Sequence, residues 1–104
     1  FHLTTRVINK REPIDLDIDA IIAAAKRTAT VLEINAYPER ADIKDDYIRK
    51  CMDAGVKMSI DSDAHAVKHF GYLDCGVAQA RRGWATRKDI INAWPVEKML
   101  KMLK

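Results

Sequence analysis

Apolar residues recur at helical spacing in four parts of the chain. Between residues 17 and 29, isoleucine and alanine return every three or four positions, and an aspartate is available to cap the start. Residues 43–54 repeat this spacing before Gly55, a residue suited to the left-handed conformation that ends many helices. We predict helices there, over residues 74–82, and after Pro95, where one face carries Val96, Met99, Leu100 and Leu103.

Two short segments between these helices have the composition of strands. Residues 30–36 (TVLEINA) are rich in β-branched side chains and precede a Tyr-Pro turn, and residues 56–60 (VKMSI) follow the second predicted helix. Residues 1–4 are interpreted as the end of a preceding strand, and the capping-box pattern of residues 86–89 predicts one more short helix. The pattern predicts an α/β fold in which parallel strands alternate with helices.

The number of strands sets a limit on the fold. A closed barrel of strands and helices usually takes about 200 residues or more, whereas the chain has 104 residues. The chain starts with Phe1 in the middle of a strand-to-loop pattern. We therefore expect residues 1–104 to be a single domain or, more specifically, the closing portion of a larger barrel.

Composition is that of an ordinary globular domain, with 48% hydrophobic and 32% charged residues. The net charge of +3 is spread along the chain, which permits an anionic partner such as nucleic acid without requiring one. The two cysteines form no CxxC pair, so we expect a reducing, cytoplasmic setting without a disulfide framework. No apolar run has membrane-spanning length, so no membrane partner is expected.

Polar side chains follow the predicted strands at the edge where parallel sheets gather function. They are His2, then Glu33 with Asn35, and finally Asp63 with His65. In an extended segment Asp63 and His65 would project to the same side, and a carboxylate beside an imidazole suits zinc or manganese. A solvated turn at residues 63–65 and a frayed terminal His2 remain the structural alternatives. His69 is interpreted as a surface residue and Cys75 as a small buried one.

Two groups of arginines are candidates for holding phosphate. Arg6, Arg11 and Arg40 can each present a guanidinium to two anionic oxygens, although ordinary surface ion pairs are the alternative for each. Arg81 and Arg82 precede Trp84, a combination that can meet a nucleic-acid backbone. The alternative there is a helix end with the tryptophan packed inward.

Several strings occur in the order found in one family. They are the His2-to-Arg6 segment followed by REP, then LEINA with Arg40 and Asp42, then SDAH, and finally GVAQARRGW. In these strings the chain resembles the phosphoesterase domain of bacterial and archaeal family X DNA polymerases, called the PHP (polymerase and histidinol phosphatase) domain. Leu3 and Thr5 depart from the proline and glycine that are usual in that family.

The resemblance implies a fold, cofactors and roles. The fold would be the C-terminal portion of a distorted (β/α)7 barrel, and the parent protein would be a metal-dependent phosphoesterase that processes 3′ ends of DNA as a 3′-5′ exonuclease. His2, Asp63 and His65 would bind zinc or manganese, with Asp63 and His65 also catalytic, and Glu33 and Asn35 would support them by hydrogen bonding. The implied partners are DNA or another phosphate ester, the rest of the domain, and a polymerase core in the same parent chain.

Most metal ligands of the family lie in strands that this sequence does not contain, so we expect the isolated chain to be inactive. Two other functions remain open. One is a non-catalytic module that binds DNA or docks on a polymerase core through residues 81–84. The other is a free-standing phosphatase for a small monoester such as histidinol phosphate, against which the polymerase-like string of residues 76–84 argues.

Overall fold

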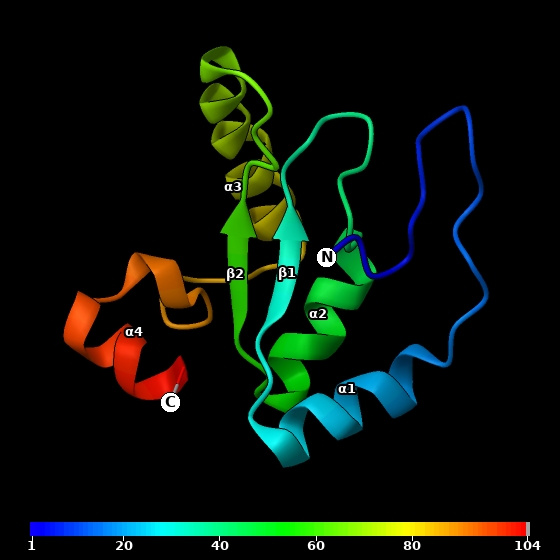
Figure 1. Cartoon of the computed structure of the whole chain (residues 1–104). Helices are drawn as coiled ribbons and strands as arrows, with labels where there is room; N and C mark the ends of the chain where they lie inside the picture. Colours follow the sequence, from blue (N-terminus) through cyan, green and yellow to red (C-terminus); the bar gives the residue numbers. More distant parts are fainter. Residues whose placement is uncertain (104) are drawn as a thin grey trace.

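The computed structural model describes residues 1–103, which fold around a short parallel sheet (Figure 1). Four α-helices and two strands alternate along most of the chain, with two 3₁₀ helices after β2 and before α4. In chain order the elements are α1 (Ile18–Thr28), β1 (Leu32–Asn35), α2 (Asp45–Ala54), β2 (Met58–Asp61), η1 (Val67–Tyr72), α3 (Leu73–Arg82), η2 (Ile91–Ala93) and α4 (Val96–Leu103).

The two strands run parallel and are in register from Leu32 opposite Met58 to Asn35 opposite Asp61. The far edge of β2 is closed by the segment that leads into η2. Met58 N donates to Asp89 O at 2.9 Å, and the Asn92 side chain exchanges two hydrogen bonds with the backbone of Ile60. At this edge of β2, backbone amides and a carbonyl thus find their hydrogen-bond partners in a turn and an amide side chain instead of in a third strand.

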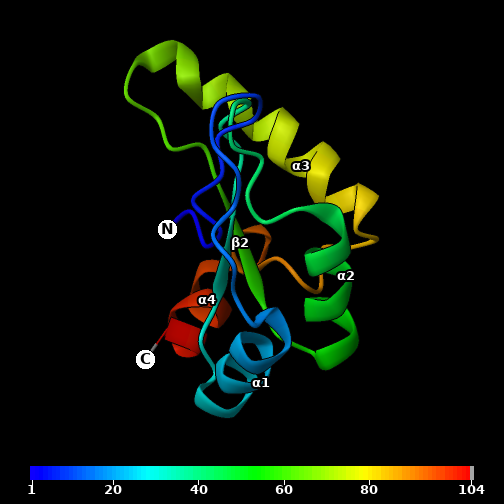
Figure 2. The ribbon, with the colours of Figure 1, turned by 90° about the vertical axis from the view of Figure 1, so that its right-hand side faces the viewer.

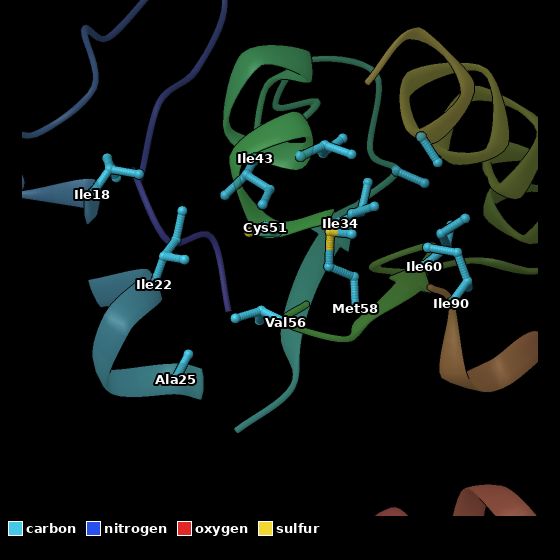
Figure 3. Close-up of a cluster of buried hydrophobic side chains, with 13 residues drawn as sticks. Ile18, Ile22, Ala25, Ile34, Ile43, Cys51, Val56, Met58, Ile60 and Ile90 are labelled. Atoms are coloured by element: carbon cyan, nitrogen blue, oxygen red, sulfur yellow. The ribbon is translucent and has the colours of Figure 1, made fainter. Parts of the chain in front are cut away.

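Alternation along the strands sorts apolar from polar side chains. Ile34, Met58 and Ile60 are buried, and Figure 3 shows them gathered with Ile43 and Cys51 of the loop and helix that cover them. The intervening residues, such as Glu33 and Ser59, line the opposite face of the sheet. Helices α2 and α3 lie on one side of the sheet, whereas α4 and the N-terminal segment lie on the other (Figure 2).

Four of the predicted helices and the two strands predicted between helices are present within a few residues of their expected bounds. Asp17 caps α1 by accepting a hydrogen bond from Ala20 N at 2.9 Å. Gly55 ends α2 in the left-handed conformation, with φ of 78°. The residues described therefore form one strand–helix–strand unit with flanking helices, an α/β arrangement as expected.

Two predicted elements are wrong. In place of the strand end predicted over residues 1–4, Thr5 N donates to His2 O at 2.7 Å and closes a turn, and the Thr4 amide and hydroxyl bind the buried carboxylate of Asp42, at 2.8 and 2.9 Å. Residues 86–89 form a turn instead of a helix. The Thr86 amide and hydroxyl do bind the Asp89 carboxylate, but the chain then extends so that Ile90 pairs with β2.

Two side chains also differ from the simplest interpretation of the sequence. Cys75 is exposed on α3, because the face of that helix that packs on the sheet is formed by Gly76 and Ala80. Trp84 is exposed, and the Arg49 guanidinium lies 4.8 Å from its ring centroid. Among residues 1–103, no helix is long and apolar enough to cross a membrane.

Candidate functional site

A polar hollow of about 280 Å³ lies where β1 and β2 end. Its lining includes Tyr37, Glu39 and Arg40 from the loop after β1, and Asp63 and His65 from the loop after β2. A larger hollow of about 540 Å³ lies along the sheet and is lined mainly by apolar side chains. We place the candidate site in the smaller hollow because it gathers three of the residues predicted from the sequence, at the strand edge where they were expected.

Asp63 is the centre of this site. One oxygen of its carboxylate, Oδ2, lies 3.7 Å from His2 Nε2 and 3.8 Å from Arg40 Nε, and the other, Oδ1, lies 3.9 Å from His65 Nδ1. The side chains of Asp63, Arg40 and His2 are between 22% and 27% exposed, whereas that of His65 is 71% exposed. These separations are too long for direct hydrogen bonds, so the carboxylate keeps room for a further partner.

A turn brings Asp63 and His65 together. Strand β2 ends at Asp61, and Asp63 has a φ of 53°, in the left-handed region that aspartate tolerates better than most residues. His65 Nδ1 then lies 2.7 Å from the Asp63 carbonyl oxygen. The proximity predicted from the sequence is present, but its predicted cause, an extended segment, is wrong.

Glu33 and Asn35 hold His2 in place. Glu33 Oε2 accepts a hydrogen bond from the His2 backbone amide at 3.0 Å, and Asn35 Nδ2 lies 3.0 Å from His2 Nδ1. Asn35 is fully buried, and its Oδ1 accepts from Tyr37 N at 3.0 Å, which directs its amide nitrogen toward the imidazole. Glu33 and Asn35 thus both contact His2, and such contacts are needed if they support it by hydrogen bonding.

These hydrogen bonds bear on metal binding. Because Asn35 donates to His2 Nδ1, the proton of a neutral His2 is on Nε2, the nitrogen that faces Asp63. His65 donates from Nδ1 to a carbonyl oxygen, which leaves Nε2 with its lone pair. Only one of the two imidazoles is therefore in the tautomer in which its outer nitrogen could bind a metal ion.

A metal ion bound to the Asp63 carboxylate would have to share it with Arg40. Its guanidinium faces Asp63 from the position where a cation would neutralise that charge. Across residues 1–103, no group of three or more histidine, cysteine, aspartate or glutamate side chains is placed to hold a metal ion. The described residues by themselves do not fit the complete zinc or manganese site that the resemblance implies.

The first group of candidate phosphate-binding arginines, Arg6, Arg11 and Arg40, occupies different positions. Arg40 lines the hollow, and its buried Nη1 has no hydrogen-bond partner within the described part of the chain. Arg6 donates to the backbone carbonyls of Arg40, at 2.7 Å, and Ala41, and Arg11 donates to Thr5 O at 2.8 Å. Arg6 and Arg11 line a separate hollow of about 320 Å³. Only Arg40 reaches Asp63.

Arg81 and Arg82 lie away from the hollow, in the last turn of α3. Figure 1 shows that α3 starts beyond the carboxyl ends of the strands and runs back behind the sheet. Arg82 Nη2 pairs with Asp45 Oδ2 at 3.2 Å at the start of α2. Slight burial would raise the pKa of Asp45, but the hydrogen bond and charge of Arg82 outweigh it and lower the pKa. This pair links α3 to α2.

Sequence reasoning missed an aromatic group beside the hollow. His69, interpreted as a surface residue, is half-buried, and its Nδ1 accepts a hydrogen bond from His65 N at 3.1 Å. Its ring stacks on Tyr72 and meets the edge of Tyr37. The available signals were the four-residue spacing of His65 and His69, and the position of Tyr37 directly after a strand.

Comparison with known proteins points to one relative. Over 103 residues, 99% of its length, the chain is 36% identical to the DNA polymerase/3′-5′ exonuclease PolX of Bacillus subtilis (strain 168). The chain spans 18% of the length of that protein. No protein-family model matches the chain. The similarity supports a relation of this chain to family X DNA polymerases.

Proposed function

We propose that this chain is part of a PHP-type phosphoesterase domain that trims 3′ ends of DNA in a parent protein related to PolX. The two-stranded sheet and its helices would be the C-terminal portion of a distorted (β/α)7 barrel, with the remaining strands supplied by the parent. The observation that carries the proposal is the cluster of Asp63, Arg40, His2 and His65 at the ends of parallel strands, in a chain similar to an exonuclease.

Arg40 is the phosphate-binding group in this proposal. Arg40 lines the hollow, and its buried Nη1 is free of hydrogen bonds to any of residues 1–103. A buried guanidinium nitrogen without a partner loses free energy that an anionic oxygen would restore. Two hydrogen bonds of Arg6, to the carbonyls of Arg40 and Ala41, hold the loop that carries this guanidinium. Arg6 thus acts on phosphate through Arg40.

Asp63 and His65 supply the other groups. A carboxylate that sits beside a bound phosphate requires compensating positive charge, and the Arg40 guanidinium provides part of it. The unprotonated Nε2 of His65 is available to take a proton from, or to hold, a group in the hollow. Zinc or manganese, if bound in the parent, would draw its further ligands from outside residues 1–103, and His2 would first have to change tautomer.

An exchange of segments tests the proposal. Residues 1–103 would replace the matched segment of Bacillus subtilis PolX, and release of 3′-terminal nucleotides would be measured beside DNA synthesis by the same protein. We expect the chimera to keep exonuclease activity, Asp63→Asn to abolish it, and Arg40→Gln to lower it about 100-fold, as for loss of one charge-stabilising donor.

The control is Asp53→Asn, which changes an exposed carboxylate paired with Arg49 on α2. It should leave both activities unchanged. Retained DNA synthesis shows that each chimera has folded. Exonuclease activity that survives Asp63→Asn undiminished would refute the proposal.

A second function has one observation in its favour. Trp84 is exposed beside Arg49 at the end of the helix that carries Arg81 and Arg82, a surface that a nucleic-acid backbone could meet. A non-catalytic DNA-binding or docking module would bind DNA in a salt-dependent way that Arg81→Ala with Arg82→Ala abolishes and a chelator does not affect. A phosphatase for small monoesters such as histidinol phosphate has less support, since the relative is a polymerase and exonuclease.

A further inference from the structure

A basic hollow lies at the end of the sheet opposite Asp63. Its volume is about 350 Å³, and it is lined by Arg87, Lys88, Ala93, Trp94, Pro95 and Lys98. Trp94 also borders a smaller hollow that includes Thr30 and Lys57, which lead into the two strands. Figure 1 shows η2 and α4, which flank Trp94, beside the amino-terminal half of β2. We call the space lined by Arg87, Lys88 and Lys98 the Trp94 hollow.

Positive charge predominates in the Trp94 hollow. Of the described residues that line it, three are cations and none is acidic. The ion pairs formed within residues 1–103 use other lysines and arginines. Asp89, which follows Lys88, is engaged by Thr86 and Lys57. A concave surface lined by one sign of charge concentrates counter-ions, so the Trp94 hollow favours an anionic ligand.

Hydrogen bonds hold the walls of the Trp94 hollow in place. Trp94 Nε1 donates to Arg87 O at 3.0 Å, and Arg87 Nε donates to Ala93 O at 3.0 Å. Lys98 Nζ lies 4.2 Å from the centroid of the Trp94 ring, and the ring attracts this ammonium. Because these contacts position two of the cations before a ligand arrives, binding costs less conformational entropy.

The kind and number of cations indicate a phosphate group. Arg87 uses Nε for the Ala93 carbonyl, which leaves its Nη1 and Nη2 for two oxygens of one ligand. Lys88 and Lys98 add two further positive charges. A phosphate monoester carries about two negative charges at neutral pH, whereas a carboxylate carries one, so phosphate matches this set of cations better.

We propose that the Trp94 hollow binds a phosphate group, held by Arg87, Lys88 and Lys98. The phosphate belongs either to a small free compound or to a nucleic-acid backbone, and the hollow recognises the chemistry that the two share. Because the Trp94 hollow lies at the amino ends of the strands and contains no residue of the Asp63 site, this proposal does not rest on the proposed function.

The two indole N–H signals of the 104-residue chain test the proposal by NMR. Trp84 and Trp94 are its only tryptophans, and the signal that remains in Trp84→Phe is that of Trp94. We expect inorganic pyrophosphate to shift the Trp94 signal until it saturates and to leave the Trp84 signal unchanged. Lys88→Gln and Lys98→Gln should each weaken this binding about 10-fold, as for loss of one charged hydrogen-bond donor.

Lys101→Gln is the matched control, because it removes the same charge from α4 at an exposed position outside the hollow. It should leave the affinity unchanged, and thermal unfolding shows whether each variant keeps its fold. Equal weakening by Lys101→Gln and Lys98→Gln, or the absence of a saturable shift of the Trp94 signal, would overturn the proposal.

Two further ligands identify the source of the phosphate. A single-stranded oligothymidylate that shifts the Trp94 signal at a lower phosphate concentration than pyrophosphate would support a nucleic-acid backbone. The reverse order would support a small free compound. Tighter binding of a short glutamate peptide than of pyrophosphate would overturn the proposal, because the hollow would then recognise an acidic polypeptide.

Discussion

Asp63 shows how the site depends on single residues. Asp63 has a left-handed conformation, and its carboxylate lies within 4 Å of nitrogen atoms of Arg40, His2 and His65, more basic side chains than any other carboxylate of the described residues has at that distance. The sequence supplied the identity of Asp63 and His65 through their order after a strand. It did not single out Arg40 from Arg6 and Arg11, because only the fold decides which guanidinium enters the hollow.

The two cysteines should differ sharply in reactivity. Cys51 is fully buried on the inner face of α2, and burial raises the pKa of its thiol to about 11. At pH 8 about 1 in 1,000 of these thiols would be ionised, so alkylation should be negligible until the chain unfolds. Cys75 is exposed.

Mass spectrometry after brief treatment with iodoacetamide should find one modification per native chain, at Cys75, and two after denaturation. Cys75→Ser is the control and should remain unmodified in the native state. Rapid modification of both thiols in native protein would show that the core around Cys51 opens more readily than its burial indicates.

At the scale of elements, the contact of α3 with the sheet depends on a glycine. A Cβ on Gly76 would lie 2.5 Å from Ile60 Cγ2 and 2.7 Å from Ala36 Cβ. Gly76→Ala should therefore lower the free energy of unfolding by about 1–3 kcal/mol through overpacking, despite the better helix propensity of alanine.

Gly71 provides the matched control, because no atom lies within 4 Å of the corresponding Cβ position. Gly71→Ala should change stability by about 0.5 kcal/mol or less. Urea denaturation measures the free energy of unfolding of both variants. If the two substitutions had equal effects, the close approach of α3 to the strands would be incorrect.

The turn that closes the edge of β2 should respond to pH through Asp89. Burial would raise the pKa of this carboxyl, but hydrogen bonds from Thr86 and the nearby Lys57 ammonium together lower it below the usual 3.8. A carboxyl with a lowered pKa adds stability that is complete above the unfolded value and is lost as the pH falls through the folded value.

Asp89→Asn should thus cost about 1 kcal/mol at neutral pH. The difference from the unaltered chain should narrow below pH 3.8, as the native carboxyl becomes protonated. Urea denaturation from pH 7 to pH 3 measures the difference, with Asp53→Asn as an exposed control. A difference that stays constant over that range would exclude the carboxylate charge as its source.

The elements themselves could be predicted where local signals were sufficient. Helical spacing and the Asp17 and Gly55 caps located α1 and α2 because these signals act within the helix. The capping-box residues Thr86 and Asp89 do bind each other, yet no helix begins at them, because Ile90 pairs with β2 before η2 starts. Tertiary contacts there outweigh local preference.

For the whole molecule, the alternation of strands and helices could be predicted from the sequence. The set of residues that meet at the candidate site could be predicted only in part. The order of polar residues after strands placed His2, Glu33, Asn35, Asp63 and His65 at one edge of the sheet. The contact between Tyr37 and His69 was missed because it joins the loop after β1 to η1, two segments that are far apart in sequence. Periodicity describes contacts within an element, whereas loops carry the contacts between them.

Also at the scale of the whole molecule, the distorted (β/α)7 barrel is a proposal. The described residues hold two paired strands, and the chain corresponds to 18% of PolX. Their site has a carboxylate, two imidazoles and a guanidinium, and its hydrogen bonds set His2 in a tautomer that does not favour metal binding. In the proposed parent, ligands from other strands would complete the site.

The most direct test is a crystal structure of the PolX chimera with a bound deoxynucleoside monophosphate. The account predicts that the phosphate lies in the hollow beside Asp63 and accepts a hydrogen bond from the Arg40 guanidinium. A nucleotide bound instead at Arg81 and Arg82, with nothing bound beside Asp63, would contradict the account and favour a DNA-binding surface without catalysis.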